Sequence, residues 1–454
     1  MKQEKILIVG AGLCGTLCAI RLAQRGYEVE LHEKRPDLRQ VDLSAGRSIN
    51  LALSDRGLRA LRMVGLEEEA LKSCIPMYGR LIHAEDGNTW FSRYSGRQED
   101  HINSISRPGL NAALLHKADT YDNLQLHFNS KCVDVDLQAG RAIFQQGEQR
   151  VEAAADIVIG TDGAGSAVRR AMMGHTTELL FNYSQHFLRH GYKELTIPAA
   201  PGGEFRIEKN ALHIWPRTSY MIIALPNLDG SFTVTMFFPF AGEKGFEQLD
   251  TPEKVNAIFA EEFADLHAHL PDLSREYFEH PVGTLGTIKC YPWQAYGKAL
   301  LMGDAAHAIV PFYGQGMNAS FEDVWVLDQI WERYEGDWSR ILPAFAEERK
   351  PDADAIADLA LDNFIEMRDQ VDDEAFIRKR KLEMQLEQHF PEYYSKYSLV
   401  TFNEDLSYAE AMRRGRAQDQ VLLDLCAVEP DEAWALDEVL AIVRRKTEAL
   451  LRGE

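Results

Sequence analysis

The chain has 454 residues, 45% of them hydrophobic and 26% charged. This is the composition of an ordinary globular protein that is long enough for two or three domains. Asp and Glu outnumber Lys and Arg by 70 to 49, and the formal net charge of −21 argues against binding to nucleic acid or to anionic membrane surfaces. The six cysteines are scattered without paired spacing, which predicts reduced thiols and a cytoplasmic location. We expect no membrane span, because the apolar stretches are too short.

The first forty residues hold the most informative pattern. An apolar run over Lys5–Val9 leads directly into residues 10–15, which read GAGLCG. A helical pattern follows as far as Arg25, and a second apolar run over Tyr27–Leu31 ends just before Glu33. The predicted order is therefore strand, glycine turn, helix, strand and acid, which is the dinucleotide-binding fingerprint in its usual structural context.

Each part of this turn has a physical role in holding a nucleotide. Gly10 permits the tight turn, Gly12 lets the backbone approach a pyrophosphate, and Gly15 lets the helix pack closely on the strand. The phosphates are expected at the helix N-terminus, where free N–H groups and the helix dipole favour anions. Glu33 is placed to accept hydrogen bonds from a ribose hydroxyl.

Two later motifs indicate which nucleotide is bound. Residues 155–168 read ADIVIGTDGAGSAV, and residues 298–307 read KALLMGDAAH, followed by PFYGQGMN over 311–318. These resemble the DG and GD motifs of the class A flavoprotein monooxygenases, whose fold is that of para-hydroxybenzoate hydroxylase. The resemblance implies bound FAD, with Asp304 on the ribityl chain and the Gly316–Asn318 helix start facing the flavin ring. Since no second GxGxxG follows a strand, NADPH is expected to be a transient co-substrate.

The predicted elements give an α/β fold class. It consists of a Rossmann-like FAD-binding domain, an inserted antiparallel β-sheet substrate domain and a C-terminal α-helical domain. Strands are predicted over 204–209, 211–215, 219–225 and 231–238, a hairpin turn over 227–230, a helix over 252–270, and an almost wholly helical region after Pro351. The expected domains are residues 1–75 with 97–175 and 287–350 for FAD, residues 76–96 with 176–286 for the sheet, and residues 351–454 for the helices.

Four further segments make the resemblance more specific. They are RSINLAL over 47–53, ISRPGLN over 105–111, AIVPFYGQGMNASFED over 308–323 and LDNFIEMR over 361–368. Together they resemble the kynurenine 3-monooxygenase family over most of residues 1–405. The resemblance implies NADPH- and O2-dependent hydroxylation of L-kynurenine to 3-hydroxy-L-kynurenine through a flavin C4a-hydroperoxide, in tryptophan degradation. Tyr313 stands where the family usually has phenylalanine, which keeps the ring and adds a hydroxyl.

The resemblance also implies the site residues. Arg80 matches the family's carboxylate-binding arginine, a role that suits the bidentate guanidinium. The substrate-binding set is Arg80, Tyr94, Phe312, Gln315, Asn363 and Tyr397. The cofactor-binding set is Gly10, Gly12, Leu13, Gly15, Glu33, Arg35, Ala52, Arg107, Asp162, Asp304, Gly316, Met317 and Asn318. We predict no catalytic general base, because the electron-rich aniline ring is itself the nucleophile, and we predict no metal ligands.

Two alternatives remain open at this point. The flavin motifs would look the same in a class A hydroxylase of another aryl amine or a phenol, and only Arg80, Tyr94 and Asn363 argue for an amino acid tail. A flavin-binding sensor or a reductase component would not be an oxygenase at all. The sequence leaves the oligomeric state open.

Overall fold

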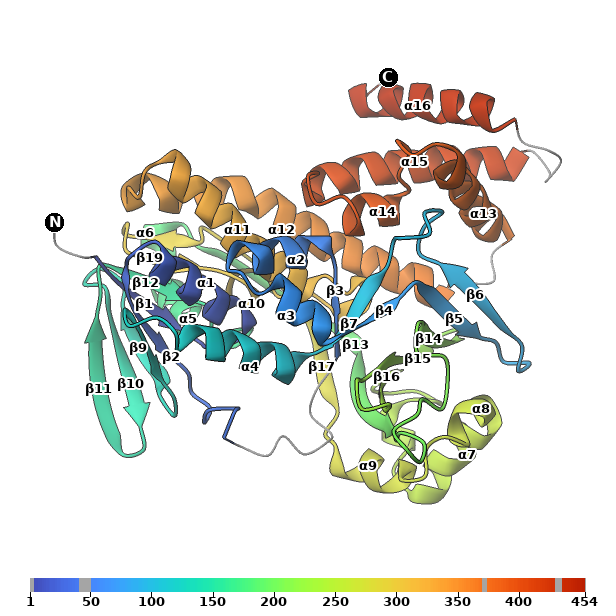
Figure 1. Cartoon of the computed structure of the whole chain (residues 1–454), viewed down its shortest axis with the longest axis horizontal. Helices are drawn as coiled ribbons and strands as arrows, with labels where there is room; N and C mark the ends of the chain where they lie inside the picture. Colours follow the sequence, from blue (N-terminus) through green and yellow to red (C-terminus); the bar gives the residue numbers. More distant parts are fainter. Residues whose placement is uncertain (1–3, 41–49, 370–373, 429–434, 454) are drawn as a thin grey trace. The chain divides into compact units, whose positions relative to one another are not determined.

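The computed structural model describes residues 4–40, 50–369, 374–428 and 435–453 (Figure 1). The chain divides into two compact units, each assembled from separate stretches of sequence. Unit 1 comprises residues 1–74, 105–187 and 286–357, and unit 2 comprises residues 75–104, 188–285 and 358–454. The division into three domains with the boundaries given above stays a prediction. Residues 47–49 of the RSINLAL segment lie outside the described residues.

Unit 1 is built on a six-stranded sheet with the order β18-β19-β12-β1-β2-β8. Its central strand β1 pairs in parallel with β2 and β12, and β8 and β19 continue the parallel pairing on either side. The predicted α/β class and the predicted strand over residues 5–9 are confirmed. The bounds are β1 Lys5–Val9, β2 Glu28–His32, β8 Leu124–His127, β12 Ile157–Gly160, β18 Gln294–Ala295 and β19 Ala299–Leu301.

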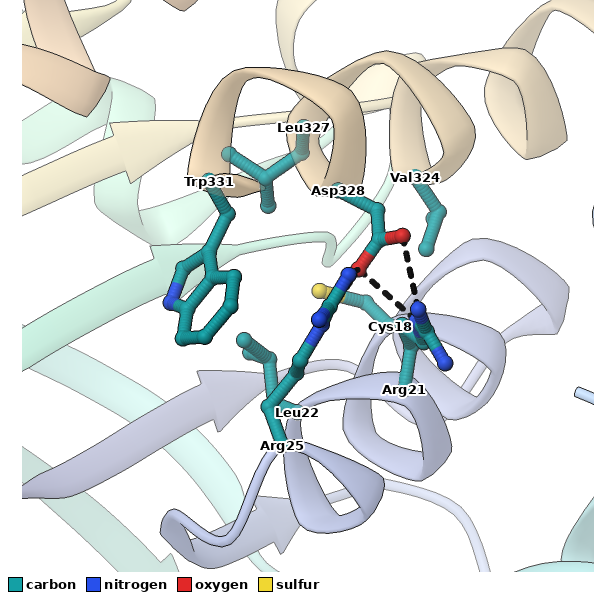
Figure 2. A pocket seen from close by; sticks show the side chains of 8 residues that line it. All are labelled: Cys18, Arg21, Leu22, Arg25, Val324, Leu327, Asp328 and Trp331. Atoms are coloured by element: carbon teal, nitrogen blue, oxygen red, sulfur yellow. Dashed lines mark hydrogen bonds and ion pairs between the residues drawn. The ribbon is translucent and has the colours of Figure 1, made fainter. Parts of the chain in front are cut away.

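The helix α1 lies against this sheet (Figure 1), and ten of its twelve residues are buried. It contacts α4 and α11, and the side chains of Leu17, Cys18 and Ile20 are fully buried. Figure 2 shows a small crevice between α1 and α11 where Asp328 pairs with Arg21 and Arg25. The bounds are α1 Leu13–Gln24, α2 Asp55–Met63, α3 Glu67–Lys72, α4 Arg107–Ala118, α5 Ala167–Gly174, α6 Thr176–Leu179, α10 Asp304–His307, η2 Pro311–Tyr313 and α11 Gly316–Arg333.

Three antiparallel strands form a second, smaller sheet in unit 1 with the order β11-β10-β9. Their bounds are β9 Lys131–Asp136, β10 Arg141–Gln146 and β11 Gln149–Ala154. Three further short strands of the chain are β3 Asn50–Leu53, β4 Cys74–Met77 and β7 Ile102–Ser106.

A seven-stranded sheet with the order β17-β13-β16-β15-β14-β5-β6 lies mainly in unit 2. The predicted hairpin is confirmed, because the Asn227 N–H donates to the Ser231 carbonyl at 2.8 Å and Gly230 takes a positive φ of 87°, which glycine adopts without strain. The bounds are β5 Gly79–His83, β6 Thr89–Arg93, β13 Asn182–Ile197, β14 Leu212–Arg217, β15 Tyr220–Pro226, β16 Phe232–Pro239 and β17 Gly283–Tyr291.

One face of this sheet packs against three short helices and forms an aromatic core. Trp215, Phe232 and Phe238 from the strands meet Phe259 and Phe263, and all five are buried. The helices and the adjoining 3-10 turn are η1 Phe246–Gln248, α7 Pro252–Glu262, α8 Ala264–His267 and α9 Leu273–Glu279.

Two predictions in this region are wrong. Residues 204–209 form turns, with only an isolated bridge from Glu204 to Ala200. Their alternating pattern arises because Phe205 and Ile207 dock on the aromatic core from a loop, without a partner strand. The predicted helix over 252–270 is interrupted at Phe263, whose φ of −134° and ψ of 42° are not helical. At this break Phe263 is fully buried, and its ring lies 5.5 Å from the Phe259 ring.

The predicted helical region at the end of the chain is confirmed in the part that the structure describes. α12 begins at Trp338, before Pro351, and runs through that proline to Asp369. α15 and α16 pack side by side (Figure 1). The bounds are α12 Trp338–Asp369, α13 Glu374–His389, α14 Lys396–Thr401, α15 Tyr408–Val428 and α16 Leu436–Arg452. Of the helices traced in these ranges, none is long and apolar enough to span a bilayer.

A chain of polar groups runs from the interior of unit 2 to its surface. The His213 ring is fully buried and is hydrogen-bonded to the Glu208 carbonyl at 2.7 Å and to His83 at 2.9 Å. His83 in turn contacts the Asp265 carboxylate at 2.7 Å. Burial lowers the pKa of His213 from 6.5 to about 4. His213 is therefore neutral in the folded protein at pH values where it is protonated in the unfolded chain.

This difference predicts a loss of stability in mild acid. Between pH 6.5 and about 4, the unfolded chain binds a proton at His213 that the folded chain does not bind. The free energy of unfolding should therefore fall by about 2 kcal/mol between pH 7 and pH 5 through this residue alone. Urea unfolding at several pH values measures it. His213→Gln should remove this part of the dependence of the unfolding free energy on pH. The control His389→Gln, at an exposed site, should keep it. An unchanged slope in His213→Gln would show that His213 is not the residue that titrates.

Candidate active site

The glycine turn between β1 and α1 has the geometry of a nucleotide cradle. Gly10 has a φ of +104°, and a Cβ there would lie 2.7 Å from the Asp162 Cα. A Cβ on Gly15 would lie 2.0 Å from the Gly10 carbonyl oxygen. A Cβ on Gly12 would meet nothing within 4 Å, so the backbone at Gly12 borders open space. Leu13, the first residue of α1, is buried.

Glu33 holds this turn in place. Its carboxylate accepts the Ala11 N–H at 3.0 Å on one oxygen, and the Arg35 N–H at 3.0 Å and Arg35 Nε at 2.8 Å on the other. The Arg35 side chain is 49% exposed. The sequence motif indicates an acid for the ribose, but it does not indicate that the same carboxylate fixes the glycine turn. Its contact with a ribose stays a prediction.

Asp162 follows β12 and has an unsatisfied acceptor. One carboxylate oxygen accepts the Ala167 N–H at 2.6 Å, whereas Oδ1 is buried and has no hydrogen-bond partner in the traced part of the chain. Burial raises the pKa of Asp162. Asp304, the first residue of α10, is exposed although the next two residues are buried. A buried acceptor without a donor fits a ligand that carries hydroxyl groups, as the ribose and ribityl groups of FAD do.

The start of α11 is fixed by Asn318, which is fully buried. Its Oδ1 accepts the Ser54 N–H at 3.0 Å, and its Nδ2 donates to the carbonyls of Ala52 at 2.8 Å and Gly314 at 3.0 Å. The side chain therefore joins the turn after β3 to the turn before α11. Gly316, at the first position of α11, has no side-chain cap in front of it, so backbone N–H groups at this end are available to an acceptor.

The remaining predicted residues of unit 1 lie near helix starts. Met317 is buried on α11. Phe312 and Gln315, which were predicted to contact substrate, are buried in the segment between α10 and α11, and the Ser54 hydroxyl contacts Gln315 at 3.4 Å. Arg107 is exposed at the start of α4, where Ser106 is the N-cap.

Unit 2 brings three of the predicted substrate residues together. Arg80 on β5 points its guanidinium at two tyrosine rings, with the centroids of Tyr94 and Tyr397 at 5.7 and 5.3 Å. The rings stack on each other at 5.2 Å with an angle of 9°. The Nε of Arg80 is buried and has no hydrogen-bond partner among the residues that the structure describes. Burial raises the pKa of Tyr94 well above its usual value, so its phenol keeps its proton and can donate.

Asn363, the fourth predicted substrate residue of unit 2, is buried on α12. A residue that the sequence did not indicate is Arg380 on α13. It donates to the Tyr94 carbonyl at 2.6 Å and to the Arg93 carbonyl at 3.1 Å, and it pairs with Glu383 at 3.2 Å. Arg380 therefore fixes the backbone that carries Tyr94.

One group of side chains in unit 1 has the composition of a metal site. Ligand atoms of Glu30, His32 and His127 lie within 4.8 Å of one another. The Lys5 ammonium lies 2.8 Å from the Glu30 carboxylate and so places a positive charge beside it already. The expectation of no metal ligands stays a prediction.

A parallel sheet with a glycine turn, an unsatisfied aspartate next to that turn and a second aspartate at a helix start suit a bound dinucleotide such as FAD. The model of the FAD binding domain family matches residues 3–360. The fold is shared with the tetrameric form of 2-methyl-3-hydroxypyridine-5-carboxylic acid oxygenase, with a TM-score of 0.68 and 23% identity over 87% of this chain and 99% of the other. It is also shared with P. aeruginosa PqsL in complex with 2-aminobenzoylacetate, with a TM-score of 0.65 and 18% identity over 81% of this chain and 98% of the other.

Curated relatives narrow the class. Kynurenine 3-monooxygenase of Myxococcus xanthus (strain DK1622) is 47% identical over 93% of this chain and 91% of the relative. The protein of the same name from Dictyostelium discoideum is 45% identical over 97% of both chains. The chain therefore belongs to the kynurenine 3-monooxygenase family.

Proposed function

We propose that this protein hydroxylates L-kynurenine to 3-hydroxy-L-kynurenine, with NADPH as the reductant and O2 as the oxidant. One oxygen atom enters the ring next to the amine, and the other leaves as water. Bound FAD, reduced by NADPH, supplies the activation of O2. The cofactor-binding residues of unit 1 that the sequence predicted are proposed to hold FAD, as the open face of Gly12 and the unsatisfied Asp162 oxygen support.

The cluster of Arg80, Tyr94 and Tyr397 carries the proposal for the substrate. A guanidinium with a buried, unsatisfied Nε beside a neutral phenol offers a positive charge and hydrogen-bond donors to one anion. Such a set suits a carboxylate. The two stacked rings add an apolar surface for an aromatic compound. L-kynurenine has both parts, an aniline ring and an amino acid tail.

The chain's own residues position the substrate and exclude water. The aniline ring is electron-rich and attacks the activated oxygen without help from a protein nucleophile or base. Fixing the ring at the right distance removes most of the entropic barrier to the transfer. The rigid support of Tyr94 by Arg380 serves this positioning.

An analogue without the carboxylate tests the substrate assignment. NADPH oxidation by the purified FAD-loaded protein should be stimulated by L-kynurenine and much less by its decarboxylated amine, because the Arg80 contact is lost. Equal stimulation by both compounds would refute the carboxylate site. Stimulation by phenols or simple anilines alone would instead make the protein a class A hydroxylase of another substrate.

Arg380→Gln should weaken substrate binding without loss of FAD. The change removes two hydrogen bonds from a charged donor to the Arg93 and Tyr94 carbonyls, so the KM for L-kynurenine should rise about 5- to 30-fold. Steady-state kinetics with measured flavin content checks this. Arg378→Gln is the control, because Arg378 is a half-buried arginine on the same helix that, among the described residues, hydrogen-bonds only the Glu374 carbonyl of that helix, and it should have a normal KM. A normal KM in Arg380→Gln would remove Arg380 from the support of the site.

We also propose that the protein works in the cytoplasm. All six cysteines are free, and burial raises the pKa of Cys18, for example, to about 12, so that thiol stays protonated and unreactive. Free thiols suit a reducing compartment. Fractionation of the source cells, followed by immunodetection, tests the location, and recovery in a secreted fraction would contradict it.

A further inference from the structure

We propose that Asp323 is a positioning residue for FAD, because it holds the Gly303-Asp304 turn in its binding conformation. Asp323 lies on α11 and is fully buried. One of its oxygens, Oδ2, accepts the Gly303 N–H at 2.8 Å and contacts Nε2 of His307 at 2.6 Å. Gly303 and His307 are the N-cap and the last residue of α10, so a single carboxylate oxygen ties down both ends of this short helix.

The turn needs such support because its backbone is unusual. Gly303 has a φ of +58° and a ψ of −146°, which residues with a side chain rarely adopt. A Cβ there would also lie 3.1 Å from the Cys14 sulfur. The Gly303 conformation sets the direction in which the next residue, the exposed Asp304, presents its carboxylate. A rotation of the Gly303 peptide would therefore move the Asp304 carboxylate away from a bound ribityl chain.

The charge of Asp323 is balanced inside the protein. Its other oxygen, Oδ1, accepts Nε of Arg349 at 2.8 Å, and Nη2 of Arg349 donates to the Ala319 carbonyl at 3.0 Å. Burial alone would raise the pKa of Asp323, but His307 and Arg349 together lower it below its ordinary value. The carboxylate is thus a fixed anion whose two oxygens together accept three contacts, from the Gly303 N–H, His307 and Arg349. An amide cannot replace it, since an amide has only one acceptor oxygen.

Asp323 also connects two parts of the proposed FAD site. It lies on the same helix as Gly316 and Asn318, about two turns further along. The Gly303-Asp304 turn and the start of α11 are therefore held at a fixed separation by one side chain. This inference rests on the use of FAD in the proposed function, and it does not depend on the identity of the substrate.

The test is an FAD titration of the apoprotein, followed by the quenching of flavin fluorescence and by the circular dichroism of the bound flavin. Asp323→Asn should raise the Kd for FAD about 10- to 100-fold and change the dichroism spectrum at saturation. A Kd and a spectrum like those of the wild type would overturn the proposal. If the wild-type apoprotein does not bind FAD, the proposed function fails instead.

Two control variants separate positioning from general stability. Glu322→Gln removes a buried carboxylate that pairs with Arg56, Arg59 and Arg349. Asp328→Asn removes the partner of Arg21 and Arg25 on another face of α11 (Figure 2). Both should lower the melting temperature of the apoprotein while the Kd for FAD stays close to that of the wild type. Equal losses of FAD affinity in Asp323→Asn, Glu322→Gln and Asp328→Asn would show that Asp323 only stabilises the fold.

A second variant keeps the proposal testable if Asp323→Asn does not fold. His307→Gln removes the imidazole contact with Asp323 and leaves the carboxylate and its Arg349 partner in place. It should weaken FAD binding less than Asp323→Asn, by about 3- to 10-fold. An unchanged Kd in folded His307→Gln would contradict the idea that the carboxylate acts by holding both ends of α10.

Discussion

Gly15→Ala is expected to destroy FAD binding. On an exposed helix this change is favourable by about 1 kcal/mol, because alanine is the better helix former. Here the new Cβ would lie 2.0 Å from the Gly10 carbonyl oxygen and 2.4 Å from the Thr161 hydroxyl. Since backbone cannot yield as a flexible side chain does, α1 has to move away from β1, and the phosphate-binding turn moves with it. The Kd for FAD should rise by about 100-fold or more.

Purification with FAD and measurement of the flavin-to-protein ratio checks this result. Gly174→Ala is the matched control, because Gly174 lies at the end of α5 where a Cβ would meet nothing within 4 Å. It should retain full flavin. A yellow Gly15→Ala protein with normal FAD affinity would show that the helix and strand are not packed as tightly as the glycine contact requires.

Arg80→Ala is expected to raise the KM for L-kynurenine about 30- to 150-fold, which corresponds to about 2–3 kcal/mol for a hydrogen-bonded charge. Bound FAD should be unaffected, since the flavin motifs belong to unit 1 and Arg80 belongs to unit 2. The KM of Arg80→Lys should lie between those of the wild type and Arg80→Ala, because an ammonium keeps the charge but not the bidentate geometry.

Arg275→Ala is the control for this series. Arg275 is an exposed arginine on α9 that pairs with Asp272 and Glu279, so the variant changes the net charge equally and should have a normal KM. Wild-type kinetics in Arg80→Ala would remove that residue from the substrate site and would leave the carboxylate without a proposed partner.

The nucleotide-binding part of the fold could be predicted from sequence because its signals are local. The strand at residues 5–9, the glycine turn and the helix after it are consecutive, and each has its own residue pattern. Residues 204–209 show the limit of such reasoning. An alternating pattern indicates that every second side chain packs against the core, but it does not say whether a partner strand is present. Phe205 and Ile207 are partly buried against the core from a loop.

In the candidate site, too, some residues could be predicted from the sequence and others could not. Arg80, Tyr94 and Tyr397 could be proposed from the family resemblance, and the structure brings them together. Arg380 could not be found in this way, because it contacts backbone carbonyls 286 and 287 residues away in the chain. Every residue has a backbone carbonyl, so the residue types do not indicate which carbonyl is contacted. Asp323 is the last residue of the segment 308–323, but its proposed role depends on a non-local contact with Gly303.

The most direct test of L-kynurenine hydroxylation is the product of aerobic turnover. The purified protein, loaded with FAD, is given NADPH and L-kynurenine in air, and the NADPH consumed is compared with the 3-hydroxy-L-kynurenine and hydrogen peroxide formed. We expect L-kynurenine to stimulate NADPH oxidation and the amount of 3-hydroxy-L-kynurenine formed to match the NADPH consumed. Stimulated oxidation that yields only hydrogen peroxide, or no stimulation at all, would contradict the claim that L-kynurenine is the substrate.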